Sequence, residues 1–492
     1  MFLQTTIIVY YKLIKTSSKL FYLEDMMENN KYLGEEKISK LLLKFSIPCV
    51  MGLLISALYN IVDQIFIGNS ELGYLGNAAT GVSFPVICIA NAFAWCIGDG
   101  AASYLSISLG KKDADSAHKC VGNGILVTTL ISVCLSIVCL IFATPLMNLF
   151  GASSDTLQMS VDYFIIISLM FPFYLLCNVL NSMIRADGAP GYAMIAMLTG
   201  AILNIILDPI FIFVLKWGIK GAAWATAIGQ IASFAMCVIY LRKPKSFILS
   251  KNSFIVDMKV LLKMISLGAS TFITQISIVI LTLVSNITLA HYGELSKYGP
   301  NIPISVFSIQ TKVFTVVCNI AVGIVLGGQP IFGYNYGAKK YDRVKETYKI
   351  VLITTIIVGL ISTVIFQLWP ELIINIFGGG DELYQEFAIK IFKIYLSLMT
   401  ITCVVKMNGI FFQSIGKPVR AVVSSLIRDV VCFTPIVIFL SIYFETVVPG
   451  AGINGIIYAA PISDFISIFV VVILTVTFFI KLSKKQVLKT IN

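Results

Sequence analysis

Three aspartates stand inside long apolar stretches in the first half of the chain: Asp63, Asp99 and Asp208. A charge near the centre of a bilayer costs at least about 2.5–3.5 kcal/mol, so acids in such stretches are candidates for function. We find no Lys or Arg at the same depth of the first half to pair with them. An unpaired carboxylate at that depth is stable only when it carries a proton or binds a cation. The three acids therefore predict a site for H⁺ or Na⁺.

Two of these acids have a polar neighbour one helical turn away. Tyr59 precedes Asp63 by four residues, and Asn204 precedes Asp208 by four, so each pair would share a helix face. Thr226, in a later apolar stretch, offers a hydroxyl that would complete a set of oxygen ligands. Such a set suits a hard cation or a protonation site equally well. We predict that these five residues form a cation-coupling site; the alternative is that each acid only caps a helix or turn.

The second half of the chain has a different charge balance. Four charged residues within its apolar stretches are two bases and two acids, which can neutralise one another as a structural network, with Gln275 as a further polar residue. Ion coupling is therefore predicted in the first half, where Asp99 is either an additional acidic cavity residue or a structural one between two glycines. The four charged residues of the second half are Lys406, Arg428, Asp429 and Asp464.

The stretches around these residues are long enough to cross a membrane. Of 492 residues, 58% are hydrophobic and 12% are charged, about half the share of charge in soluble domains. A helix needs about 20 apolar residues to span a bilayer, and the alternating pattern of a membrane β-barrel is missing. We predict an all-α integral membrane protein with twelve transmembrane helices. They lie at 41–67, 79–109, 120–143, 159–181, 191–215, 221–241, 260–290, 303–328, 346–368, 387–414, 419–443 and 452–480.

Basic residues gather in alternate loops. The net charge of +11 would also suit nucleic-acid binding, but its placement follows the positive-inside rule. We predict a multi-pass protein of the cell membrane with both termini in the cytoplasm, in contact with the lipid bilayer and with no nucleic acid. The inside loops and tail contain Lys111, Lys112, Lys119, Arg185, Arg242, Lys243, Lys245, Lys251, Lys259, Lys339, Lys340, Arg343, Lys345, Lys417, Arg420, Lys481, Lys484, Lys485 and Lys489, against Lys216, Lys220 and Lys297 outside.

Three short motifs recur in the second half in the same order. The pairs are Leu109–Asp113 with Tyr336–Asp342, Gly188–Pro190 with Gly416–Pro418, and Gly218–Ala223 with Gly452–Ile457. Six helices per unit, an even number, leave both units the same way up, so two six-helix bundles should be related by a pseudo-two-fold axis along the membrane normal. The predicted parts are an N-terminal extension (1–35, with 1–25 unstructured or mis-assigned), an N-lobe (36–241), a cytoplasmic linker (242–259), a C-lobe (260–480) and a basic tail (481–492).

Enzymatic and metal-binding motifs are missing from the sequence. The eleven cysteines form no CxxC pair, and the loops are too short for a soluble catalytic domain. We therefore predict a protein that is not an enzyme, with no cofactor and no metal beyond the coupling ion. The aromatic share of 12% could line an adaptable cavity for flat cations, although most such residues serve packing or contact lipid.

The motifs together resemble those of the multidrug and toxic compound extrusion (MATE) family over roughly residues 36–480. The resemblance rests on Ser46–Pro48, Tyr59–Gly68, Leu109–Asp113, Arg185–Pro190, Asn204–Pro209, Gly221–Thr226 and Gln329–Ala338. It implies two six-helix lobes around a central cleft, and export of lipophilic or cationic organic compounds in exchange for H⁺ or Na⁺. It also implies ion-coupling roles for Asp63, Asn204, Asp208 and Thr226, with Tyr59 beside them.

One departure separates this chain from another branch of that family, which has acidic residues in helices seven and ten. Here helix seven has Gln275 and helix ten has Lys406, so no cation site is expected in the second lobe. We expect small-molecule organic cations or drugs as partners, and a monomer. The alternative is a flippase for a lipid-linked sugar, whose phosphate would need a basic cleft.

Overall fold

The computed structural model describes residues 31–299, 301–376 and 381–491. Within these ranges the chain is helical and contains no strand. The predicted extension lies outside the described residues as far as residue 30, and so does the hypothesis about residues 1–25. A short 3₁₀ helix, η1 (Lys31–Gly34), precedes the first span.

Twelve spans agree with the prediction. In the described part of the chain, ten helices are long and apolar enough to cross a membrane, and two bent helix pairs supply one span each. The first six spans are α2 (Ile38–Gly68), α3 (Gly73–Lys111), α4 (Ala114–Ile141), the pair α6 (Leu157–Leu169) and α7 (Phe171–Ala186), α8 (Pro190–Pro209) with η2 (Ile210–Val214), and α9 (Gly218–Tyr240). The other six are α10 (Met258–Glu294), α11 (Asn301–Gly337), α12 (Tyr341–Leu368), the pair α14 (Glu382–Tyr395) and α15 (Met399–Ser414), α16 (Pro418–Leu426) with η4 (Ile427–Phe433) and α17 (Thr434–Val447), and α18 (Asn454–Ile491).

Spans four and ten are bent, which the sequence reading missed. The axes of α6 and α7 differ by 53°, and those of α14 and α15 by 51°. Pro172 in the first turn of α7 has no backbone N–H and would clash with the turn before it, which explains the break at Met170. No proline explains the break before Met399. The predicted spans at 159–181 and 387–414 are therefore present, each as two helices joined at a bend.

The internal repeat is visible in the order and shape of the elements. A short helix follows span three and span nine at the same offset: α5 (Ala143–Leu149) and α13 (Pro370–Ile376). Spans four and ten are the two bent pairs, and spans five and eleven each contain a π-helical segment, η2 and η4. The first two turns that repeat in the sequence also match in backbone, since Lys112 and Lys339 have φ of 63° and 59°, and Gly188 and Gly416 have 82° and 74°. Both halves thus have one architecture.

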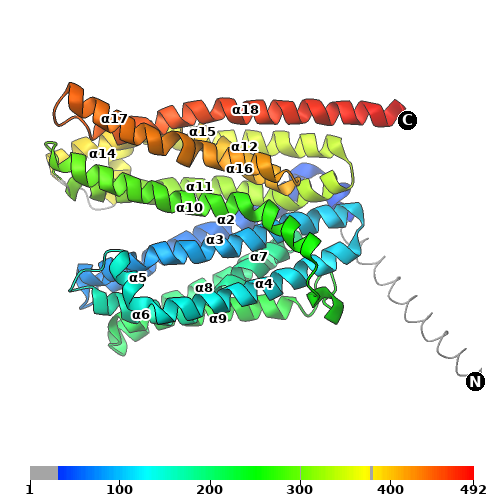
Figure 1. The fold of residues 1–492 in the computed structure, drawn as a ribbon, viewed down its shortest axis with the longest axis horizontal. Helices are drawn as coiled ribbons and strands as arrows, with labels where there is room; N and C mark the ends of the chain where they lie inside the picture. The colour runs from blue at the N-terminus through cyan, green and yellow to red at the C-terminus, as the bar shows by residue number, and fades with distance from the viewer. Residues whose placement is uncertain (1–30, 300, 377–380, 492) are drawn as a thin grey trace, which may run out of the picture.

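The helices separate into two halves in space (Figure 1), α2–α9 and α10–α18, which we call the N-lobe and the C-lobe. The lobes meet along a seam where α10 packs on α3, and α11 packs on α2 and α3. The lobe boundaries given by the sequence, 36–241 and 260–480, stay a prediction.

Glycines bring the lobes into backbone contact along part of this seam. A Cβ atom at Gly268 would collide with the carbonyl oxygen of Cys96, and one at Gly323 would lie 2.7 Å from the Cα atom of Val50. The other close approaches pair Gly100 with Met264, Gly110 with Tyr334, Gly327 with Ser46, and Gly337 with Ile107. All six lie in the half of the bundle that carries the loop between the lobes, which we call the linker end. The seam is therefore tightly closed at the linker end.

The linker itself is tied to the N-lobe. The buried Asp187 carboxylate accepts hydrogen bonds from the Tyr240 hydroxyl, the Lys245 and Ser246 backbone N–H groups and the Ser246 hydroxyl. Further along, the Asn123 amide donates to the carbonyls of Ser253, in the 3₁₀ helix η3 (Lys251–Phe254), and of Ile255. These hydrogen bonds hold the linker against the N-lobe.

The outward faces of the bundle are apolar. Leu130, Ile137, Ile357, Phe439 and Phe469 are each about half exposed or more. Exposure of so large an apolar surface to water would be unfavourable, whereas lipid can cover it. The fold is therefore that of a multi-pass membrane protein.

Candidate ion-coupling site

The register between α2 and α8 places two acids together. Both helices begin at the linker end and run in the same direction, and Gly52 of α2 lies against the sulfur of Met197 on α8. Eleven residues later in each helix, about three turns, come Asp63 and Asp208. Their carboxyl groups lie side by side, close enough to share a hydrogen bond when one is protonated.

A second helix contact adds the amide and the hydroxyl. α8 and α9 run in opposite directions and cross with Gly200 against Gly229, where neither backbone leaves room for a side chain. One turn beyond this crossing on α8 lies Asn204, and one turn back on α9 lies Thr226. The Asn204 Nδ2 group donates to Oδ1 of Asp208 (3.2 Å) and to Oγ1 of Thr226 (3.3 Å). The two glycines therefore fix the distance between the polar side chains.

The site is buried and rich in unused acceptors. Asp63, Asn204 and Asp208 are 6%, 2% and 0% exposed. Three oxygen atoms, one from each of these side chains, accept no hydrogen bond: Asp63 Oδ1, Asn204 Oδ1 and Asp208 Oδ2. Within the described residues, no Lys or Arg forms an ion pair with either acid. Two adjacent carboxyl groups with free oxygens fit a shared proton or a small hard cation.

Tyr59 lies beside Asp63, as its spacing predicts. The sequence reading missed two other neighbours. Gln64, next to Asp63, donates through Nε2 to Thr80 Oγ1 on α3 (3.1 Å), and the buried Tyr163 on α6 lies within electrostatic range of both acids. Gln64 was overlooked because consecutive helix residues point about 100° apart. Nothing in the apolar sequence around Tyr163 distinguishes it.

Asp99 does have a basic partner, which corrects the prediction that no base is available at its depth. The last turn of α7 brings Nη2 of Arg185 to 3.4 Å from Asp99 Oδ1, and the Ser182 hydroxyl donates to the same oxygen (3.0 Å). Arg185 was assigned to a loop, but it lies inside the helix. Across the seam, Gln329 of α11 donates to the Asp99 carbonyl (3.4 Å) and to Ser103 (3.0 Å). Asp99 therefore belongs to the closed seam and not to the Asp63–Asp208 site.

The charged residues of the second half contact one another. Arg428 donates through Nε to Asp464 and through Nη1 to Asp429, both at 2.6 Å, and Lys406 Nζ lies 3.7 Å from Asp429. Two bases thus face two acids, with Arg428 and both acids at most 4% exposed. In the part of the chain that the structure describes, no hydrogen bond joins Gln275 to this group, although its side chain is buried.

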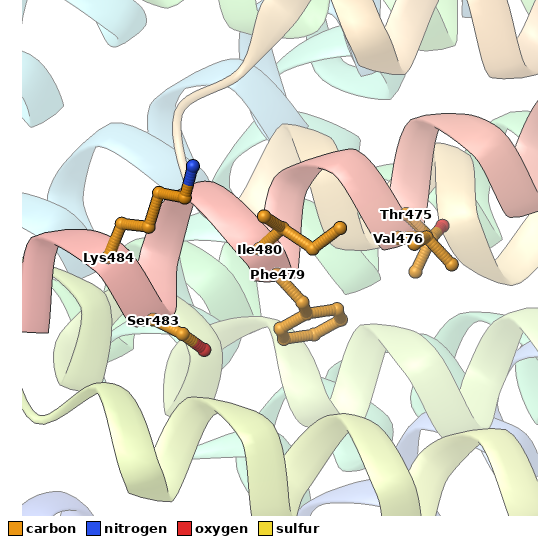
Figure 2. Close-up of a pocket in the computed structure, with 6 residues that line it drawn as sticks. All are labelled: Thr475, Val476, Phe479, Ile480, Ser483 and Lys484. Atoms are coloured by element: carbon orange, nitrogen blue, oxygen red, sulfur yellow. The ribbon is translucent and has the colours of Figure 1, made fainter.

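A shallow hollow lies near the C-terminal end of α18 (Figure 2). Its lining comes from this helix alone: Thr475, Val476, Phe479, Ile480, Ser483 and Lys484. None of the six is a carboxylate, so the hollow is separate from the paired acids. Among the described residues, no group of three or more His, Cys, Asp or Glu side chains could bind a metal.

The fold and the buried acid pair define a multi-pass membrane transporter rather than an enzyme. The MatE family model matches residues 48–210 and 270–441, one segment in each lobe. The chain belongs to the MatE family of efflux transporters.

Curated relatives and solved structures agree with this assignment. The multidrug export protein MepA of Staphylococcus haemolyticus (strain JCSC1435) is 26% identical over 451 residues, which cover 89% of this chain and 94% of that protein. MepA of Staphylococcus aureus (strain MRSA252) is 27% identical over 88% of this chain and 92% of its own length. A MATE crystal structure in the straight conformation has a TM-score of 0.84 at 21% identity, covering 92% and 98% of the two chains. A multidrug resistance MATE family transporter in an outward-facing conformation has a TM-score of 0.82, with the same identity and coverage.

Proposed function

We propose that this chain is a secondary antiporter that exports lipophilic or cationic organic compounds in exchange for H⁺. The observation that carries the proposal is the contact between the Asp63 and Asp208 carboxyl groups. Two carboxylates at contact distance repel each other, and burial of both as ions is costly, so one proton held between them is the stable state. Na⁺ is the second candidate, favoured by the three oxygens that accept no hydrogen bond.

The cycle follows from the coupling of this acid pair to the position of α2. Protonation removes the repulsion between α2 and α8, whereas loss of the proton pushes the two helices apart. Because α2 also packs on α11 across the seam, its movement changes how the lobes meet. The ion and the exported compound would then bind alternately. One charge crossing 100 mV supplies about 2.3 kcal/mol to drive the exchange.

The positive-inside rule puts the linker end in the cytoplasm, so the glycine contacts close the seam on the cytoplasmic side. The protein would lie in the cell membrane with both termini inside. One chain contains both lobes, so a monomer is sufficient for the cycle.

The proposed class of exported compound rests on the names of the curated relatives and on the charge of the N-lobe site. The MepA proteins are named multidrug export proteins, and two acids without a base in the N-lobe site favour organic cations. A flippase for a lipid-linked sugar is the competing function, because its fold would be related and its cargo anionic.

Ethidium efflux from proteoliposomes tests the proposal. An imposed pH gradient should accelerate efflux by the purified chain, an imposed Na⁺ gradient of equal size should not, and Asp63→Asn should abolish the acceleration. Acceleration by the Na⁺ gradient alone would show that Na⁺, and not H⁺, is the coupling ion. No transport under either gradient would favour the flippase.

A further inference from the structure

Lys312 is an unexpected charge within the membrane-spanning helix α11. It lies eleven residues into α11, roughly 16 Å along the helix axis from Asn301. Its side chain is exposed, and no described acid forms an ion pair with it. Two other lysines of the C-lobe do have an acidic partner: Lys406 lies 3.7 Å from Asp429, and Lys297 lies 2.6 Å from Glu386.

The face of α11 that carries Lys312 points away from the C-lobe core. Val306, Phe307, Val317 and Cys318, on the opposite side of the helix, pack in the apolar cluster of the C-lobe. Residues seven apart share a face, and Lys312 shares its face with Ser305 and Asn319. Ser305 is exposed and Asn319 is half-buried. The result is a polar stripe along this face of α11.

This stripe continues into the seam and not into lipid. Toward the linker end the same face presents Gly323 and Gly327, which meet Val50 and Ser46 of α2. The two helices are thus antiparallel here: a position four residues later in α11 contacts a position four residues earlier in α2. Continuing this antiparallel register brings Lys312 level with Ile61, two residues from Asp63. An ammonium group at this depth would be costly against lipid, so its exposure indicates water between the lobes.

We propose that Lys312 binds an anionic group, a carboxylate or phosphate, of the compound that the protein carries. The inference rests on the proposed transport function. An ammonium group with three donors suits either anion as a point charge. Ser305 and Asn319 lie two turns away on either side, roughly 10 Å along the axis, and keep this face of α11 polar. The paired acids lie on the other side of the seam. A cargo with a cationic and an anionic end therefore fits better than a simple cation.

A matched dye pair tests this subsite: a rhodamine with a free carboxylate, and its methyl ester, which lacks only that charge. Binding to the purified chain is measured by fluorescence polarisation in nanodiscs of zwitterionic lipid. Lys312→Gln should weaken binding of the free acid about tenfold, the usual scale of a charge-assisted hydrogen bond, and leave the ester unchanged. Lys312→Arg and the loop variant Lys216→Gln should keep the wild-type ratio.

The outcomes separate this inference from the proposed function. Equal weakening of both dyes, no change in either, or no binding of either dye by the wild type would each overturn the anionic subsite. Anionic nanodiscs that compete with the free acid in the wild type but not in Lys312→Gln would show that the anion bound there is a lipid phosphate. Gradient-driven efflux of the ester is measured separately, and its absence in the wild type would overturn only the antiport proposal.

Discussion

The carboxyl groups of Asp63 on α2 and Asp208 on α8 lie side by side, although 145 residues separate them in the chain. The contact is set three turns away, where Gly52 lets α2 approach Met197. Both acids are buried without a basic partner among the described residues, so each one determines the charge that the other can carry.

Removal of either acid should therefore stop coupled efflux. We expect Asp63→Asn and Asp208→Asn each to lower gradient-driven ethidium efflux at least about tenfold, and the double variant to be no worse than either one, because the pair acts as a unit. Proteoliposome efflux under a pH gradient measures this, with Asp155→Asn in an exposed turn as the control. Additive losses in the double variant would show that the acids work independently.

The Thr226 hydroxyl should have a smaller effect than the acids. Thr226→Val removes one acceptor from Asn204 Nδ2, which still donates to Asp208, so we expect a stability loss of about 0.5–1.5 kcal/mol and a severalfold weaker ion dependence. Thr226→Ser restores the hydroxyl and should behave as the wild type. The measurement is the ion concentration at half-maximal efflux. An unchanged value in Thr226→Val would remove this residue from the site.

Much of the site could be predicted because helical spacing is local. The sequence alone places Tyr59 on the face of Asp63 and Asn204 on the face of Asp208, and the structure has both arrangements. The contact between the two acids was not predictable, because it depends on the relative register of α2 and α8. Gln64 and Tyr163 reach the site only through that packing.

The number of spans could be predicted from the sequence, whereas their bends could not. Hydrophobic length fixes how many helices cross the bilayer, whereas the bends in spans four and ten depend on Pro172 in one case and on no visible residue in the other. The end of span eight was also set too early, at 328. α11 runs to Gly337 because polar residues such as Gln329 and Asn335 are buried against neighbours rather than left in lipid.

Arg185 is predicted to stabilise the N-lobe more than its partner Asp99 does. Loss of the guanidinium in Arg185→Gln leaves a buried carboxylate unpaired, which typically costs about 3–5 kcal/mol. Asp99→Asn keeps a polar side chain beside Ser182 and should cost less. Thermal unfolding in detergent compares both variants with the double variant, which should recover part of the loss. If the loss of stability in the double variant equalled the sum of the losses in the two single variants, Arg185 and Asp99 would not stabilise each other.

The linker should loosen at low pH. Asp257 caps α10, and hydrogen bonds from the backbone N–H of Val260, then the nearby Lys119, lower its pKa, although partial desolvation opposes them. A lowered pKa stabilises the folded state above the unfolded-state pKa, and this contribution disappears as the pH falls through the folded-state pKa. Asp257→Asn should therefore lower the melting temperature at neutral pH and not at pH values below the folded-state pKa. If Asp257→Asn lowered the melting temperature equally at neutral and at low pH, the Asp257 carboxylate would not have this role.

Gly268 is predicted to control which end of the seam opens. A Cβ atom at this position would collide with the Cys96 carbonyl group of α3, so we expect Gly268→Ala to separate the lobes at the linker end. The folded lobes themselves need not change, because the collision is between them. We therefore expect a shift away from the closed linker end, and slower efflux, without a large loss of folded protein.

The distance between spin labels on the linker-end turns, at Lys112 and Lys339, reports this shift. Gly81→Ala on the same α3 helix is the matched control, because a Cβ atom there meets nothing within 4 Å. A longer label distance in Gly268→Ala and an unchanged one in Gly81→Ala would show that the glycine contact holds the linker end of the seam closed. An unchanged distance in both would mean that the helices bend around the new methyl group, and that the closed seam depends on the polar contact of Gln329 with Asp99 and Ser103 instead.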